Sequence, residues 1–175
     1  MNVFLTVLIA LFSISECLGK SITKDVIKRA ADKCCTPKQF KCCVDLMTFG
    51  KPIGCGFEES RSLPQVAFTC IQDHLFANEP EKKMKLDDSR CCEVFAHDVN
   101  DTGRQCESVC KAAMTAPSLT ADQKISKIKE CTLLENPMFG CFSECRRLRS
   151  EGIRIEVLQF DEVCNSTRSS QLQES

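Results

Sequence analysis

The stretch DDSRCCEVFAHD, residues 87–98, places two adjacent cysteines between an acidic start and a His-Asp dipeptide. Neighbouring Cα atoms lie about 3.8 Å apart, which is shorter than the usual span of a disulfide. Adjacent cysteines on a helix also point roughly 100° apart, because an α-helix has about 3.6 residues per turn. Cys91 and Cys92 are therefore predicted to bond two different partners, on a helix capped by Asp87 or Asp88.

The first nineteen residues, MNVFLTVLIALFSISECLG, are predicted to be a secretory signal peptide that is removed after Gly19. Their apolar run is shorter than the roughly 20 residues that span a membrane. The sequence then predicts one disulfide-rich helical domain over residues 20–164 and a polar tail over residues 165–175. Glycosylation sequons at Asn100 and Asn165 agree with passage through the secretory route.

The cysteine count predicts how this domain is stabilised. The chain has fifteen cysteines among 175 residues, and fourteen remain once Cys17 leaves with the signal peptide. An even count at this density in a secreted chain is typical of a disulfide framework, here of seven bonds. The predicted disulfide cysteines are Cys34, Cys35, Cys42, Cys43, Cys55, Cys70, Cys91, Cys92, Cys106, Cys110, Cys131, Cys141, Cys145 and Cys164.

Apolar side chains recur at helical spacing along nearly the whole chain, which predicts an all-α fold. Ser21 or Thr23 is expected to cap the first helix, and Thr120 and Gln123 have the spacing of a capping box. IRIEVLQF alternates like a strand and predicts a short extended arm near residues 153–160. The predicted helices cover residues 21–35, 39–50, 62–78, 87–99, 104–116, 121–135 and 137–150.

Charge and cysteine spacing narrow the classes of partner and cofactor. The 23 Lys and Arg nearly balance the 24 Asp and Glu, which argues against a nucleic-acid or strongly anionic partner. The absence of a second long apolar run argues against a membrane span. Zinc sites use cysteines separated by about two residues, and these cysteines lack that spacing. The sequence therefore predicts no metal and no cofactor.

The order of the cysteines resembles the DB module, a cysteine-rich domain of nematode extracellular proteins. From Cys91 the chain has an adjacent pair, thirteen residues, C-x3-C, twenty residues, then C-x9-C followed by Phe142. Twelve cysteines match that family in order over residues 34–142. The resemblance implies an extracellular domain without an assigned molecular function. Cys145 and Cys164 lie outside the pattern, and are expected to pair and tie the C-terminal arm to the last helix.

His97-Asp98 raises another function class, because the stretch resembles the His-Asp helix of secreted calcium-dependent phospholipases. In those enzymes the His is a general base and the Asp helps to bind calcium. Here the spacing is CC-x4-HD and not CC-x2-HD, and two extra residues turn an α-helix by about 200°. The glycines beside Cys55 also lie too far along the chain for a compact calcium loop. His97 is interpreted as a partly exposed residue near a helix end, His74 as a packing or surface residue, and no catalytic residue is predicted.

We therefore predict a non-enzymatic extracellular protein that binds another extracellular protein or a matrix component. A helical ligand carrier or co-receptor-like module is the remaining alternative, and a carrier would need an apolar cavity. CRRLRSEGIRIE, residues 145–156, has four arginines that would suit a glycan or an acidic partner. Because Glu144, Glu151 and Glu156 offset that charge, a solvated face is the favoured interpretation.

Overall fold

The computed structural model describes residues 22–57, 63–98, 101, 103–131, 137–153 and 164. Within these ranges the chain forms helices and turns without a strand, which confirms the predicted all-α class. No helix there is both long enough and apolar enough to cross a membrane. The predicted signal peptide, both sequons, the polar tail and residues 154–160 of the predicted arm lie outside the described residues.

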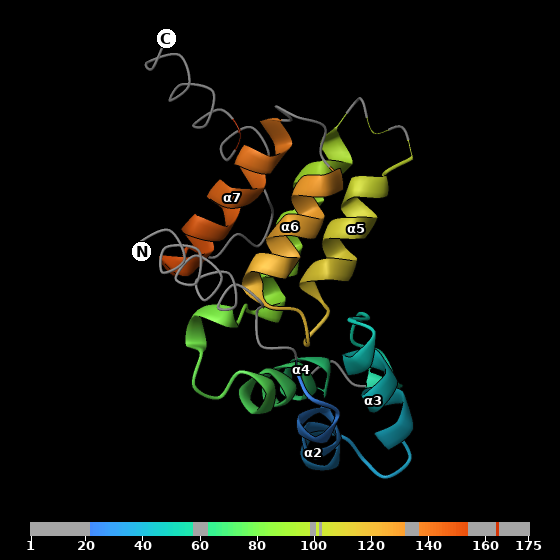
Figure 1. The fold of residues 1–175 in the computed structure, drawn as a ribbon. Coiled ribbons are helices and arrows are strands. Elements are labelled where there is room, and N and C mark those ends of the chain that lie inside the picture. The colour runs from blue at the N-terminus through green and yellow to red at the C-terminus, as the bar shows by residue number, and fades with distance from the viewer. Residues whose placement is uncertain are drawn as a thin grey trace, which may run out of the picture.

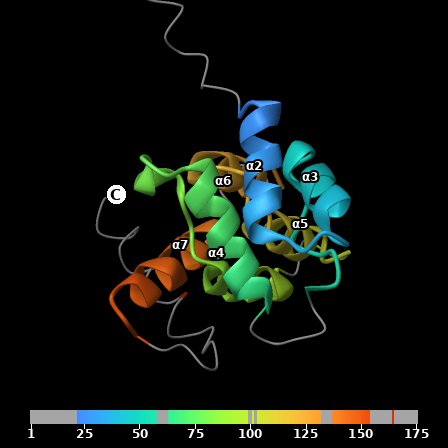
Figure 2. The same cartoon turned by 90° about the horizontal axis from the view of Figure 1, so that it is seen from below.

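Three helices form what we call the N-terminal half, described between residues 22 and 75: α2 (Lys24–Cys34), α3 (Phe40–Thr48) and α4 (Leu63–Leu75). α2 lies between the other two helices and packs against both (Figure 2). Thr23 caps α2, because its Oγ1 accepts a hydrogen bond from the backbone amide of Val26 at 3.5 Å. The buried core of this half consists of Ile27, Ala30, Ala31, Cys43, Leu46, Met47, Phe57, Ala67 and Ile71.

The middle of the chain contains two 3-10 helices, η2 (Pro80–Lys82) and η3 (Leu86–His97). The sequence predicts an α-helix in place of η3, with Asp87 or Asp88 as its cap, and both predictions are wrong. Lys85 occupies the cap position, and no side chain there accepts a capping hydrogen bond.

The tighter winding of η3 follows from the spacing of its buried side chains. A 3-10 helix has about three residues per turn, so residues three apart share a face. Asp87, Arg90 and Glu93 keep this spacing and are exposed, while the positions between them are buried or half-buried. The buried side chains of η3 are Cys91, Cys92, Val94 and Phe95.

Three further helices pack with η3 to form the C-terminal half: α5 (Gln105–Met114), α6 (Ala121–Cys131) and α7 (Pro137–Ser150). They lie together above the N-terminal half in Figure 1. This half has its own buried core, which includes Val94, Phe95, Met114, Ile128, Phe142 and most of the disulfide cysteines of the half.

Local signals fix where α6 begins and where α7 ends. The amide of Gln123 donates to Oγ1 of Thr120 at 3.2 Å, and the amide of Thr120 donates to Oε1 of Gln123 at 3.0 Å. These two reciprocal hydrogen bonds are the capping box that the sequence predicts. Gly152 follows α7 with a φ of 84°, a conformation that glycine adopts without steric cost.

Seven disulfides join the fourteen cysteines, three within the N-terminal half and four within the C-terminal half. Each adjacent pair bonds two different partners, so α2 is fastened to both α3 and α4, and η3 to both α5 and α7. None of the seven bridges joins one half to the other. The bridges are Cys34–Cys70, Cys35–Cys43, Cys42–Cys55, Cys91–Cys145, Cys92–Cys110, Cys106–Cys131 and Cys141–Cys164.

The expected bridge between Cys145 and Cys164 is wrong. Cys145 bonds Cys91 of η3, and Cys164 bonds Cys141. Cys141 and Cys145 lie one turn apart on the same face of α7. The Cα atoms of Cys91 and Cys145 are 5.7 Å apart, which is an ordinary disulfide span. Cys164 is therefore tied to α7 as expected, but through Cys141, which lies one turn nearer the start of the helix than Cys145.

The two halves meet through noncovalent contacts among the described residues. The amide of Ile53 donates to the carbonyl of Thr115 at 2.8 Å, across the boundary. Phe68 of α4 is 1% exposed, and the Nζ atom of Lys124 from α6 lies 4.6 Å from the centroid of its ring. Packing and polar contacts therefore hold the halves together, whereas disulfides hold each half internally.

Candidate functional site

The His97-Asp98 dipeptide of the hydrolase alternative lies at the end of η3. His97 is the last residue of the helix and is exposed, and Asp98 follows it half-buried. The cysteine pair of the same helix is fully buried in the core of the C-terminal half. The glycines that resemble part of a calcium loop flank Cys55, which is bonded to Cys42 in the N-terminal half. The fold therefore places the two elements of the phospholipase hypothesis in different halves.

The second histidine, His74, lies beside the Cys34–Cys70 disulfide near the end of α4. Its Nδ1 is 3.8 Å from Sγ of Cys34 and 3.1 Å from the carbonyl oxygen of Cys70. One potential metal-ligand atom from each of Cys34, Cys70 and His74 lies within 4.8 Å of the other two. A cysteine binds a metal as a thiolate, however, and these two sulfurs are bonded to each other. We interpret the cluster as a structural bridge with a histidine packed beside it.

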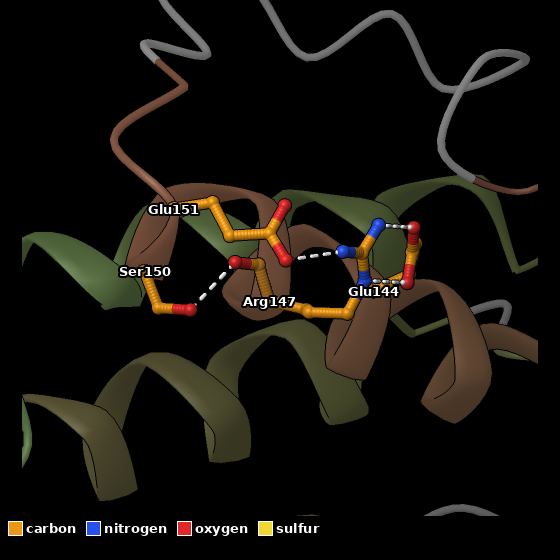
Figure 3. Close-up of polar contacts among 4 residues, drawn as sticks. All are labelled: Glu144, Arg147, Ser150 and Glu151. Atoms are coloured by element: carbon orange, nitrogen blue, oxygen red, sulfur yellow. Dashed lines mark hydrogen bonds and ion pairs between the residues drawn. The ribbon is translucent and has the colours of Figure 1, made fainter.

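The arginine-rich segment that the sequence suggests as a binding surface is largely neutralised by its own neighbours. The guanidinium of Arg147 donates two hydrogen bonds to the carboxylate of Glu144, at 2.7 and 2.8 Å, and one to Glu151 at 2.5 Å (Figure 3). The hydrogen bonds from Arg147 hold the pKa of the Glu144 carboxyl below its usual range. Glu144 and Arg147 belong to α7 and Glu151 directly follows the helix, so the charge balance arises locally.

Two other arginines of α7 face inward, toward η3 and the core. Nε of Arg149 lies 3.7 Å from Oδ1 of Asp88, and the guanidinium of Arg146 lies 5.7 Å from the ring centroid of Phe142. Burial raises the pKa of the Asp88 carboxyl, and the positive charges of Arg146 and Arg149 partly oppose that effect. Asp88 therefore connects η3 to α7 and does not cap its own helix.

A different surface is rich in cations that lack such partners. A cleft of about 480 Å³ lies along α2, near the start of α3 and the end of α4, and we call it the α2 cleft. Among the described residues, none of its three lysine or arginine side chains takes part in an ion pair. Its polar lining includes Lys28, Arg29, Asp32, Lys33 and His74, and its apolar lining includes Val26 and Phe40.

The charge of the α2 cleft belongs to a wider asymmetry in the chain. Residues 22–57 contain seven Lys and Arg and three Asp, which gives a net charge of +4. Residues 86–153 contain nine Lys and Arg and eleven Asp and Glu, a net charge of −2. Sequence analysis missed this surface because the net charge of the whole chain hides it. The signal that would have revealed it is the local run of basic residues from Lys24 to Lys41.

A second cleft, of about 420 Å³, lies where the end of α3 meets α5 and α6. Its lining includes Gly50, Pro52, Val109, Leu119 and Lys127. Val109 is 37% exposed, so part of this apolar surface faces solvent. Both clefts are open to the surface, whereas a ligand carrier needs an apolar cavity that encloses its cargo.

Sequence analysis also missed a buried cation at the boundary between the halves. Lys124 is 0% exposed, and its Nζ donates a hydrogen bond to the carbonyl of Met114 at 3.1 Å. Burial lowers the pKa of the Lys124 ammonium to about 7, while the charge of Asp88 raises it and that of Arg146 lowers it further. The ammonium also lies over the Phe68 ring, so it contacts both halves.

Comparison with known proteins identifies the family. A family model described as Caenorhabditis elegans Her-1 matches residues 23–168 of this chain. The chain belongs to the Her-1 family. It is 52% identical over 147 residues to protein her-1 of Caenorhabditis elegans, and the match covers 84% of each chain. The crystal structure of C. elegans HER-1 matches with a TM-score of 0.75 and 51% identity, over 80% of this chain and 98% of that chain.

These matches refine the resemblance drawn from the cysteine pattern. The chain is a cysteine-rich Her-1 homologue whose fourteen described cysteines form disulfides. The narrower comparison with the DB module is not confirmed, because the family model that matches is that of Her-1. The coarser prediction, a cysteine-rich domain of a nematode type, agrees with the Her-1 match.

Proposed function

We propose that this Her-1 family member is a secreted extracellular protein that acts by binding a partner and carries out no chemistry on it. The observation that supports binding is the α2 cleft, where exposed cations lie on a helix that disulfides hold to both of its neighbours. Cations that are not paired within the protein are available to a partner. A surface fixed before binding also loses less conformational entropy on association.

Two kinds of observation support secretion. Disulfides persist in oxidising compartments and are rare in the reducing cytosol, and this chain forms seven of them. The predicted signal peptide, residues 1–19, and the sequons at Asn100 and Asn165 are the further marks of an exported glycoprotein.

Secretion is tested by expressing the full chain with a C-terminal tag in cultured animal cells. We expect the protein in the medium, beginning at Lys20 and carrying sugar at Asn100, Asn165 or both. After removal of the sugar, its intact mass should be about 14 Da below that of the reduced chain, because seven bonds remove fourteen hydrogens. Retention of a reduced protein inside the cells would contradict the proposal.

Binding is tested with the purified protein, labelled and added to intact cells. We expect binding that saturates with concentration and that is lost when the disulfides are reduced and the thiols alkylated. The reduced and alkylated chain is the matched control, because it has the same sequence and nearly the same charge without the fold. Equal binding of both forms would mean that the folded surface recognises nothing.

The phospholipase alternative has its own test. The protein is incubated with mixed phospholipid vesicles and calcium, beside a His97→Gln variant. We expect no release of fatty acid by either protein, because the fold separates His97 from the glycines around Cys55. Calcium-dependent release that the variant loses would contradict the non-enzymatic proposal.

A further inference from the structure

We infer that the α2 cleft binds a sulfated polysaccharide chain, of the kind found on cell surfaces and in the extracellular matrix. The inference rests on the proposed function and gives the partner a chemical class. It depends on three features of the N-terminal half. These are the cations spread along α2, the absence of ion pairs to them among the described residues, and the disulfides that tether the end of the helix.

The cations of α2 are spread along the exposed surface of the helix. Lys24, Lys28, Arg29 and Lys33 are all exposed, and the last three line the α2 cleft. At a rise of about 1.5 Å and a turn of roughly 100° per residue, the four residues are spread over roughly 13 Å of the helix length and about half of its circumference. Lys38 and Lys41, near the start of α3, are also exposed. Positive charges distributed over this area suit a chain with repeated negative charges better than one small anion.

Unlike Arg147 and Arg149 of α7, the cations of α2 form no ion pair among the described residues, although Asp25 and Asp32 are exposed on the same helix. Arg147 is paired with Glu144 of its own helix and with Glu151 directly after the helix (Figure 3). Of the α2 residues, only Asp32 contributes an acidic group to the cleft, beside three cations and His74. Among the described residues, no ion pair involves any of the basic side chains of α2. A partner therefore need not displace an existing carboxylate.

The chemistry of the lining selects a sulfated sugar. Sulfate esters stay ionised at all physiological pH values, and hydrogen bonds from Lys and Arg to such oxyanions are strengthened by charge. Clusters of basic residues are typical of surfaces that bind heparin-like chains. Val26 and the half-buried ring of Phe40 add apolar surface, which can contact the C–H groups on one face of a sugar ring.

The disulfides preorganise this surface. Cys34 and Cys35 directly follow Lys33, and they bond α4 and α3 respectively. The C-terminal end of α2, which carries Lys33, is therefore tethered to both of its neighbours. Because the scaffold is fixed, the remaining entropy cost of binding is mainly the ordering of the lysine and arginine side chains.

The inference is tested with the full disulfide-bonded protein and a heparin-derived dodecasaccharide in a surface-binding assay. We expect binding at physiological salt and none to the same oligosaccharide after its sulfates are removed. A triple variant, Lys28→Gln, Arg29→Gln and Lys33→Gln, should bind at least about tenfold more weakly. The slope of log affinity against log salt should fall by roughly 2 in magnitude, because three fewer cations release counterions.

A matched variant separates the α2 cleft from charge in general. Lys85→Gln, Arg90→Gln and Lys127→Gln remove the same charge from exposed positions outside the cleft, and we expect less than about a twofold change in affinity. Unfolding curves of both variants check that the fold is retained. No binding by the wild-type protein, or an equal loss in both variants, would overturn the inference.

The cell assay distinguishes this inference from the proposed function. Enzymatic removal of sulfated glycans from the cell surface should abolish most of the saturable binding. Saturable binding that persists after this treatment, with no affinity for the dodecasaccharide, would overturn the glycan inference and leave the proposed function intact. If that persistent binding were lost in the triple variant of the cleft, the partner would be an acidic protein surface instead of a glycan.

Discussion

In the N-terminal half two disulfides fasten α2 to α3 and α4, and a third ties α3 to the segment that follows it. In the C-terminal half four disulfides fasten η3 to α5 and α7, α5 to α6, and α7 to the arm. The same device therefore builds both cores. The halves differ in their charges, because the basic side chains of α2 have no ion pairs while those of α7 contact Glu144, Glu151 and Asp88.

This difference indicates that α2 is positioned without its charged side chains, whereas ion pairs help to position α7. Where disulfides and apolar packing position a helix, as in α2, its charged side chains are free to face solvent and a partner. In α7 the arginines help to place the helix against η3 through Asp88, so the same residue type serves the fold.

The largest expected effect is on the disulfide that closes the longest loop of the C-terminal half. Cys91 and Cys145 are 54 residues apart in sequence and both are fully buried. Replacing both by alanine should lower the free energy of unfolding by about 4 kcal/mol, because the unfolded chain regains the entropy of that loop. Chemical denaturation with the other six bonds intact measures the change.

The short bridge of the N-terminal half is the matched comparison. Cys35 and Cys43 are 8 residues apart, so the same double replacement by alanine should cost only about 2.5 kcal/mol on loop entropy. A larger loss for this pair than for Cys91 and Cys145 would contradict the comparison. It would mean that the N-terminal half depends more on its cross-links than loop length predicts.

The next effect concerns the buried ammonium at the boundary between the halves. The pKa of Lys124 is about 7 in the folded protein and 10.5 in an unperturbed chain. Between pH 7 and 9.5 the unfolded state therefore binds a proton that the folded state has released. The free energy of unfolding should rise through this range by up to about 1.4 kcal/mol per pH unit. A Lys124→Met variant should lose this rise.

The slope with pH is the diagnostic quantity in that experiment. The variant also loses the hydrogen bond to Met114 and the contact with the Phe68 ring, which shifts its stability by a similar amount at every pH above 7.5. Lys127→Met, an exposed substitution on the same helix, should keep the slope of the wild type. Identical slopes in wild type and Lys124→Met would show that the Lys124 ammonium is not the group that titrates.

Much of the fold could be predicted because its signals are local. Helical periodicity, the Thr120–Gln123 capping box and the different partners of each adjacent cysteine pair depend on residues close in sequence. The 3-10 winding of η3 was missed, although polar residues at every third position from Asp87 to Glu93 carry its signal. The pairing of Cys145 with Cys91 depends on which face of α7 meets η3, and spacing alone does not contain that information.

The candidate site was harder to predict because it depends on which charges remain unpaired after folding. Of the glutamates expected to offset the basic residues in 145–156, Glu144 and Glu151 do pair with Arg147. The charge elsewhere was hidden in the whole-chain sum, in which the positive α2–α3 region and the more acidic C-terminal half cancel. The burial of Lys124 was equally hidden, because an amphipathic helix normally directs a lysine toward solvent and tertiary packing decides otherwise.

The smallest expected effect tests the packing of the two halves against each other. Gly50 and Gly56 have φ values of 58° and 78°, so alanine at either position should cost about 1–2 kcal/mol of backbone strain. A Cβ at Gly50 would lie 2.8 Å from Cδ2 of Leu119 in the other half, whereas at Gly56 it would meet no atom within 4 Å. Gly50→Ala should therefore lower the free energy of unfolding by roughly 1 kcal/mol more than Gly56→Ala.

A double-mutant cycle assigns that excess to the boundary. In a Leu119→Ala background the clashing methyl group is gone, so the two glycine substitutions should become equally costly. The backbone strain of alanine at a positive φ does not depend on Leu119, so it remains in both glycine variants. An excess that persists in this background would place its origin in the backbone at Gly50, and the two halves would then have room to move apart at this contact. If the extra cost of Gly50→Ala disappears in the Leu119→Ala background, a steric clash with the Leu119 side chain causes it. The segment after α3 is then packed tightly against the segment between α5 and α6, without a disulfide between the halves.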